Sequence, residues 1–176
     1  MQFSRKERLF LVNQYRILQK LSESESEKKE YENLIEALVS GYRIHYHDFF
    51  EEFSTVDMPE EDSQYVLDIL EMYRGIIFSY MKLMRDKVKI SIRPEDIVFP
   101  GFDGNDRKES QYLNYTNYFI NSLGRYEEIN KINKGNFSAG NCTCNKYDRM
   151  LSIWRELDSI GRYFMGEERI KELLNA

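Results

Sequence analysis

The feature that most constrains the fold is an apolar pattern of helical period between Pro59 and Asp86. One stripe of this pattern recurs every three or four positions and consists of Val66, Ile69, Leu70, Tyr73, Ile77, Tyr80 and Met84. Further apolar residues widen it, namely Leu67, Met72, Ile76, Phe78, Met81 and Leu83. A helix that is apolar on nearly all sides is buried among other helices. The sequence therefore predicts a long, buried central helix over Pro59 to Asp86.

Three residues interrupt the apolar character of this predicted helix. Gly75 costs about 1 kcal/mol relative to alanine in a helix interior, so we expect a neighbouring helix to approach closely there. Glu71 and Arg74 are three positions apart and can form an ion pair. Such a pair beside a buried face must be well satisfied. We expect a structural ion pair, with part of a ligand or active site as the alternative.

Shorter helical patterns lie on both sides of the central stretch. Ser4 and Glu7 have the spacing of a capping box, which predicts a first helix directly behind them. A second helix is predicted to end at Gly41. A short helix is predicted within Ile44–Phe53, and a terminal helix at Glu167–Leu174. Another begins near Arg107, and its core stripe is Tyr112, Tyr115, Phe119, Leu123 and Tyr126. The last runs from Tyr147 to about Leu157, with Met150, Leu151 and Trp154 expected to be buried.

Two stretches between these helices are predicted to be loops. Lys87–Asp106 contains two prolines and two glycines, Pro94, Pro100, Gly101 and Gly104, and is expected to include an extended piece at Lys89–Ile92. Asn130–Asn145 is rich in glycine, asparagine and serine and is expected to be mobile. The pattern as a whole indicates an all-α, multihelical single domain over residues 1–176.

Charge and hydropathy limit the partners and the compartment. The net charge is −5, which disfavours general affinity for nucleic-acid phosphates. Local basic clusters at Arg5, Lys6 and Arg8, and at Arg85, Lys87, Lys89 and Arg93, leave nucleic-acid binding as the least favoured hypothesis. No apolar run is long enough to span a bilayer, and the N-terminal residues lack the features of a signal peptide. We therefore expect a cytoplasmic protein that does not bind membranes.

Several short sequence patterns occur in a fixed order along the chain. They are RLFLVNQYRIL at residues 8–18, DILEMY at 68–73, FPGFD at 99–103, E-x-x-Y-L-x-Y at 109–115, GRY at 124–126 and YDRMLSIW at 147–154. Their ordered combination resembles the YfbU family of bacterial proteins over nearly the whole chain. The resemblance implies a multihelical cytoplasmic domain, and it implies no established activity.

Asp103 is the first candidate for chemistry outside the central helix. It comes just before a predicted helix, where its carboxylate is expected to cap free backbone N–H groups. The alternative is a binding role in which Asp103 pairs with Arg125. Together with Glu71 and Arg74, these two residues form the candidate ligand site.

The histidines and cysteines are the remaining candidates. His45, His47, Asp48 and Glu51 are possible metal ligands. On a helix His47 and Glu51 share a face but His45 and His47 do not, so too few of these side chains would converge on one ion. Cys142 and Cys144 supply two thiols at most, whereas structural zinc sites use four ligands. We expect ordinary free thiols, no metal site and no cofactor. No catalytic or phosphate-binding motif is present, so no catalytic residue is assigned.

Two functions follow from these observations. The first is a non-enzymatic interaction or regulatory domain that associates with itself as a homodimer or larger oligomer, because surplus tyrosine, phenylalanine and methionine are common at interfaces. The alternative is an enzyme or small-ligand binder with a polar pocket between helices, around Glu71, Arg74, Asp103 and Arg125. The alternative predicts that these side chains converge on one pocket.

Overall fold

The computed structural model describes residues 2–50, 53 and 56–176. Helices dominate the described residues, which confirms the predicted all-α class. The chain divides into two compact units, residues 1–57 and 58–176, which are described separately below. The prediction that residues 1–176 form a single domain stays a prediction. Every described helix is too short or too polar to span a bilayer.

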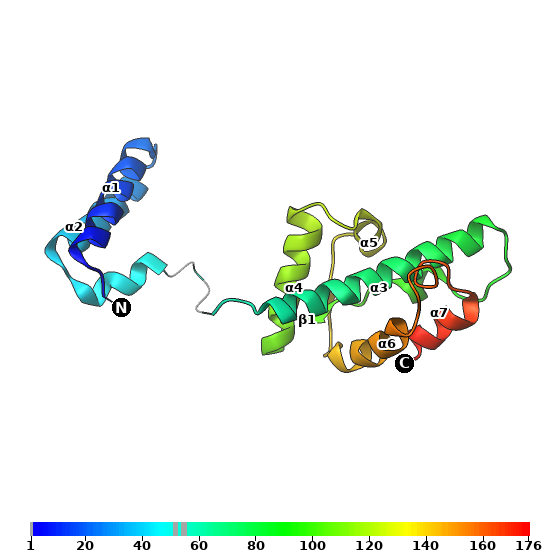
Figure 1. Cartoon of the computed structure of the whole chain (residues 1–176). Coiled ribbons are helices and arrows are strands. Elements are labelled where there is room, and N and C mark those ends of the chain that lie inside the picture. The colour runs from blue at the N-terminus through cyan, green and yellow to red at the C-terminus, as the bar shows by residue number, and fades with distance from the viewer. Residues whose placement is uncertain (1, 51–52, 54–55) are drawn as a thin grey trace. The chain divides into compact units, whose positions relative to one another are not determined.

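The N-terminal unit is a hairpin of two helices followed by a short 3-10 helix (Figure 1). These elements are α1 (Arg5–Leu21), α2 (Glu25–Ser40) and η1 (Arg43–Phe50). The predicted capping box begins α1, since Ser4 N donates to Glu7 at 2.7 Å and Glu7 N donates to Ser4 Oγ at 3.3 Å. Gly41 ends α2 with φ 75°, a left-handed conformation that glycine adopts without strain.

The core of the N-terminal unit is small. Its buried apolar residues are Val12, Leu38, Tyr46 and Phe49. Phe3 adds an aromatic contact, with its ring centroid 4.8 Å from that of Tyr46. The short helix predicted within Ile44–Phe53 is present as η1, which ends at Phe50, so the described residue Phe53 is not part of it; residues 51 and 52 lie outside the described residues.

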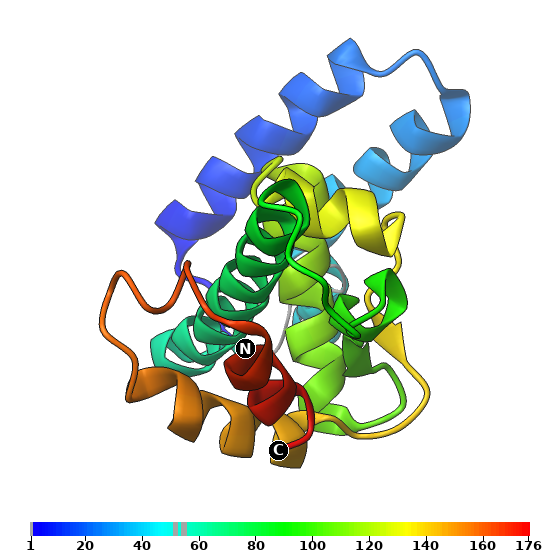
Figure 2. The ribbon, with the colours of Figure 1, turned by 90° about the vertical axis from the view of Figure 1, so that its right-hand side faces the viewer.

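The C-terminal unit is built around α3 (Glu60–Arg85), which is buried along its middle. This helix confirms the predicted central helix, with Pro59 and Asp86 as its two caps. It contacts α4 (Arg107–Asn117), α5 (Glu127–Asn133), α6 (Cys144–Arg155) and α7 (Glu167–Leu174). Figures 1 and 2 show α5 on one side of α3 and α6 with α7 on the other.

Gly75 permits the close approach that its position predicts. A Cβ atom at this site would lie 2.3 Å from the ring of Trp154 on α6 and 2.3 Å from the backbone oxygen of Arg162. Contacts this short do not occur in folded proteins, so any larger residue would push these neighbours away. The helix-propensity cost of glycine is therefore offset by tight packing against α6 and the segment after it.

The two predicted loops are joined by one short pairing of strands. Residues 89–92 belong to no helix or strand, and the extended piece predicted there stays a prediction. In the first loop β1 (Phe102–Asp103) pairs in parallel with β2 (Ser138–Ala139) of the second. The loop predicted over Asn130–Asn145 is wrong at both ends, because α5 extends to Asn133 and α6 begins at Cys144. Its middle is anchored by Phe137, whose side chain is 1% exposed.

Gly101 explains why the two strands can meet. Its φ is 86°, and a Cβ atom there would lie 1.8 Å from the backbone oxygen of Phe137. That oxygen accepts a hydrogen bond of 2.9 Å from Phe102 N. Two further short helices complete the unit, η2 (Pro94–Ile97) and η3 (Tyr118–Ser122), the latter a wider π-type turn that continues α4.

Candidate functional site

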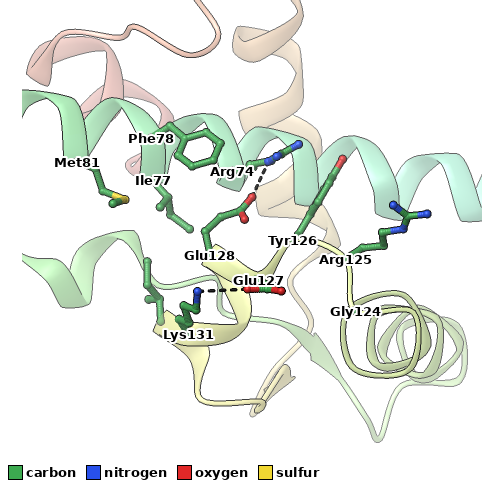
Figure 3. A pocket seen from close by; sticks show the side chains of 11 residues that line it. Arg74, Ile77, Phe78, Met81, Gly124, Arg125, Tyr126, Glu127, Glu128 and Lys131 are labelled. Atoms are coloured by element: carbon green, nitrogen blue, oxygen red, sulfur yellow. Dashed lines mark hydrogen bonds and ion pairs between the residues drawn. The ribbon is translucent and has the colours of Figure 1, made fainter.

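A pocket of about 620 Å³ lies between the second half of α3 and residues 124–132 (Figure 3). Apolar and charged side chains both face it. The lining residues are Arg74, Ile77, Phe78, Met81, Gly124, Arg125, Tyr126, Glu127, Glu128, Lys131 and Ile132. Its volume falls within the range of about 300–1,000 Å³ that is typical of small-molecule sites. All of these residues belong to the C-terminal unit.

Arg74 is the most firmly held charged residue of the pocket. Its guanidinium lies over the ring of Tyr126, 4.6 Å from the centroid, and over that of Phe78 at 5.3 Å. Its Nε atom is 2.5 Å from Glu128 Oε1, and its Nη1 atom is 3.9 Å from Glu71 Oε2. The predicted pair of Glu71 and Arg74 is therefore present, and Glu128 is the closer partner. Two rings and two carboxylates fix the plane of the guanidinium.

Tyr126 connects the pocket to α3. Its hydroxyl donates a short hydrogen bond to Glu71 Oε2. Burial, and then this hydrogen bond, raise the pKa of Tyr126 to about 12, so the phenol stays protonated. The backbone of Tyr126 has φ 50° and follows Gly124 with φ 63°. The predicted helical stripe therefore stops before Tyr126, and a left-handed turn directs this side chain toward α3 instead.

The same turn explains the error in the predicted stripe through Leu123. That stripe assumes one helix from near Arg107 to Tyr126, whereas η3 ends at Ser122. Leu123 is 48% exposed, so it is not a core residue. Tyr112 is buried as predicted. Its hydroxyl donates to Asp62 on α3 at 2.7 Å.

Arg125 and Lys131 are the other cations of the pocket. Lys131 Nζ is 3.3 Å from Glu127 Oε2, and both side chains are more than two-thirds exposed. Arg125 is exposed. No carboxylate in the described part of the chain lies within ion-pair distance of it. In Figure 3, Tyr126 lies between Met81 and the guanidinium of Arg125, which is at one end of the pocket.

Asp103 does not join the other three predicted site residues. Glu71 and Arg74 interact beside the pocket and Arg125 lines it, while Asp103 lies on β1, buried at 9% exposure. Its Oδ1 accepts hydrogen bonds from the backbone and side chain of Asn105, at 2.9 and 3.2 Å. The described residues include no ion pair between Asp103 and Arg125.

The predicted capping role of Asp103 is also wrong, because the N-cap of α4 is Asp106. Its Oδ1 accepts from Lys108 N and Glu109 N, both at 2.9 Å. Residues 104–106 form a turn between β1 and the helix, so the helix starts later than the sequence pattern suggests. Asp103 instead stabilises this turn through Asn105.

Glu109 is a buried carboxylate that the sequence analysis does not identify as important. It is 3% exposed and accepts hydrogen bonds from the backbone N–H groups of Asp103 at 2.8 Å, Thr143 at 2.8 Å and Cys144 at 3.0 Å. Burial raises its pKa, but these backbone bonds outweigh burial and hold the pKa of Glu109 below its ordinary value. Thr143 and Cys144 lie 34 and 35 positions from Glu109 in the sequence, so no local pattern indicates the cluster.

The two cysteines lie near this carboxylate, and their surroundings disfavour the thiolate form. Burial, followed by a hydrogen bond with Glu109, raises the pKa of Cys144 to about 12. Burial and neighbouring carboxylates also raise the pKa of Cys142. Both residues are free thiols. Because only thiolates attack electrophiles or bind metals readily, these thiols are poor nucleophiles.

Both histidines lie beside the carboxylate of Asp48, and His47 Nδ1 is also 2.8 Å from the backbone oxygen of Ile44. His47 Nε2 is 2.8 Å from Asp48 Oδ1, and His45 Nδ1 is 3.5 Å from Asp48 Oδ2. Glu51, the fourth residue of this candidate, lies outside the described residues. Among those that are described, no group of three or more histidine, cysteine, aspartate or glutamate side chains is arranged to hold a metal ion.

Comparison with known proteins places the chain in a family. The model of the YfbU domain matches residues 1–176, across both compact units. The chain is also 33% identical over 175 residues to the UPF0304 protein MJECS11 of Methanocaldococcus jannaschii, covering 98% of this chain and 99% of that protein. This relative is archaeal, so the family is not confined to bacteria. The chain belongs to the YfbU family.

Proposed function

We propose that this protein is a non-enzymatic helical interaction module that associates with itself through its N-terminal unit. The single observation that carries the proposal is the amount of apolar surface that this unit leaves uncovered. Between Leu9 and Ile44, eight large apolar residues are more than 40% exposed: Leu9, Phe10, Ile17, Leu18, Leu21, Val39, Tyr42 and Ile44. Large apolar patches on a protein surface mark interaction sites.

The exposed residues of α1 form a stripe along the helix. Phe10, Ile17 and Leu21 are spaced by seven and four positions, which places them on one face. Phe10 is 71% and Leu21 72% exposed, whereas Val12 on the opposite face is buried. Burying one such side chain contributes about 1.5–3 kcal/mol. The core cluster of this unit contains four buried apolar residues, so covering the stripe would add substantially to the apolar area that stabilises the unit.

The proposed partner is a second copy of the chain, because the two helices of the hairpin carry opposite charge. Helix α1 has five basic residues and one acidic residue, a net charge of +4. Helix α2 has five acidic and two basic residues, a net charge of −3. In a two-fold pair of hairpins, α1 of one copy packs beside α2 of the other, so that a four-helix bundle joins opposite charges and buries both stripes.

The test is the mass of the full chain in solution, measured by light scattering and sedimentation equilibrium. We expect a dimer whose dissociation constant rises with salt, because screening weakens the attraction between α1 and α2. The double substitution Phe10→Glu and Ile17→Glu is expected to give a monomer with an unchanged helical circular dichroism spectrum.

The matched control is Met84→Glu, which changes an exposed apolar residue of α3 in the other unit. This variant is expected to remain a dimer. A native chain that is strictly monomeric at micromolar concentration would overturn the proposal. So would a dimer that Met84→Glu disrupts and the α1 substitutions leave intact.

A second candidate function is the binding of a small molecule in the pocket beside α3. Its support is the combination of a 620 Å³ volume with the fixed guanidinium of Arg74. The lining residues include no histidine, cysteine or serine, and the proposal is therefore restricted to binding. Saturable binding of a small molecule, lost when residues of the pocket are substituted, is the test.

A further inference from the structure

The pocket beside α3 has an apolar wall and a charged end. The wall comes from Ile77, Phe78 and Met81 on α3 and from Ile132 on α5. Ile77 is fully buried, whereas Met81 is 56% exposed. A rigid floor with a flexible, polarisable methionine at its edge suits an aromatic or branched aliphatic group of variable shape. Figure 3 shows Met81 and Ile77 at one end and Arg125 at the other.

The charges around the pocket favour an anion. The lining residues carry three positive charges, from Arg74, Arg125 and Lys131, against two negative charges, from Glu127 and Glu128. Glu71 is not a lining residue, and its carboxylate is bonded to the Tyr126 hydroxyl. The lining therefore has an excess of one positive charge.

Arg125 supplies this excess. The ion pair of Lys131 with Glu127 and that of Arg74 with Glu128 compensate the other two cations. Exposed pairs such as Lys131 with Glu127 contribute only about 0–1 kcal/mol, so Lys131 also remains available. Arg125 has no carboxylate partner among the described residues, and a planar guanidinium can bind a carboxylate with two parallel hydrogen bonds.

We propose that this pocket binds a small amphipathic carboxylate, with its apolar body on Ile77, Phe78 and Met81 and its carboxylate on Arg125. Arg74 is the positioning residue, since Tyr126 and Phe78 hold its guanidinium and thereby shape the middle of the pocket. A head group with one negative charge suits Arg125, the guanidinium of the pocket that has no carboxylate partner among the described residues, whereas a polyanion would meet Glu127 and Glu128. This inference rests on the second candidate function.

The experiment compares three probes of the same shape and different charge on the full chain. They are 3-phenylpropionate, the neutral 3-phenylpropan-1-ol and the cationic 3-phenylpropylamine, with binding followed by ligand-observed NMR and calorimetry. At about 0.3 kcal/mol per heavy atom, the acid is expected to bind with a dissociation constant on the order of millimolar. The alcohol is expected to bind more weakly, and the amine most weakly.

Variants of the pocket separate its two parts. Arg125→Glu is expected to weaken binding of the acid about tenfold or more and to leave the affinity for the alcohol unchanged. Arg125→Lys is expected to retain most of the affinity for the acid. Met81→Asp is expected to weaken the binding of both the acid and the alcohol. Arg107→Glu, an exposed charge reversal at the start of α4 outside the pocket lining, is the matched control and leaves all affinities unchanged.

The outcomes distinguish this inference from the function on which it rests. If the alcohol or the amine binds more tightly than the acid, the pocket is a ligand site and the carboxylate assignment is overturned. If none of the three probes binds saturably, both the inference and the second candidate function are overturned. Equal affinity of Arg125→Glu and the native chain for the acid would also overturn the inference. Self-association is measured separately, with the α1 substitutions that lie outside this unit.

Discussion

The carboxylate of Glu109 on α4 accepts the backbone N–H of Cys144, the first residue of α6, at 3.0 Å. The same carboxylate accepts the N–H groups of Thr143 and of Asp103 on β1. A negative charge at the first turn of a helix is also stabilised by the helix dipole. One buried side chain thus joins β1 and the start of α4 to the start of α6, which lies 34 and 35 positions further along the sequence.

Glu109→Gln is expected to destabilise the C-terminal unit by about 1–3 kcal/mol, the usual cost of leaving buried donors without their charged acceptor. The amide has the same shape as the carboxylate, so packing is preserved and the loss reports the hydrogen bonds. Urea denaturation at neutral pH measures it. Glu172→Gln, in an exposed pair with Arg169, is the control and should change stability by less than about 0.5 kcal/mol.

The stabilisation by Glu109 depends on pH in a direction that its pKa determines. Because the pKa of Glu109 is lower in the folded chain, the unfolded chain binds more protons as the solution is acidified. The contribution is complete above the unfolded pKa of about 4.3 and is lost as pH falls through the folded pKa. Stability curves between neutral and acid pH should therefore be flatter for Glu109→Gln than for the native chain. Parallel curves would contradict the assignment.

Gly75→Ala is expected to destabilise the protein, although alanine is the better helix former. The added methyl group would meet the Trp154 ring and a backbone oxygen at 2.3 Å, and overpacking of this kind costs about 1–3 kcal/mol. Thermal unfolding measures the loss. Gly140→Ala has open space around its Cβ position and should be close to neutral. A Gly75→Ala protein as stable as the native chain would show that α6 can move away without cost.

Phe137→Ala tests whether the segment Asn130–Asn145, which the sequence predicts to be mobile, is held in place by the buried side chain of Phe137. Phe137 is 1% exposed, and its ring centroid is 6.2 Å from that of Phe99. Replacing a buried phenylalanine by alanine costs about 3–5 kcal/mol. Hydrogen exchange should show faster exchange at the backbone N–H of Phe102, which bonds to Phe137 O. If the segment were mobile in solution, this substitution would have little effect on either measurement.

Tyr126→Phe removes the hydroxyl that donates to Glu71. Hydrogen bonds to charged groups contribute about 1.5–3 kcal/mol, and we expect a loss in this range by chemical denaturation. The ring remains, so its contact with Arg74 is preserved. Tyr118→Phe is the control, because Tyr118 is 52% exposed and its hydroxyl makes no hydrogen bond to the described residues. Equal stability of the two variants would argue against a role for this bond.

Local patterns in the sequence are sufficient for most of the helices. The apolar period, the capping box of Ser4 and Glu7 and the position of Gly41 depend on residues within a few positions of one another, and the structure agrees with each. The pair of Glu71 with Arg74 is also local, since both lie on one helix. The sequence cannot show that Glu128 is the closer partner of Arg74, because α5 brings it there from 54 positions away.

The sequence by itself determined the all-α class, the span of α3 and the close approach at Gly75, because periodicity, caps and the absence of a side chain act over one or two helical turns. Only the tertiary structure decided the pairing of β1 with β2, the burial of Glu109 and the left-handed turn that directs Tyr126 toward Glu71. Each of these depends on hydrogen bonds between segments distant in the chain, and such bonds form only once the helices have packed.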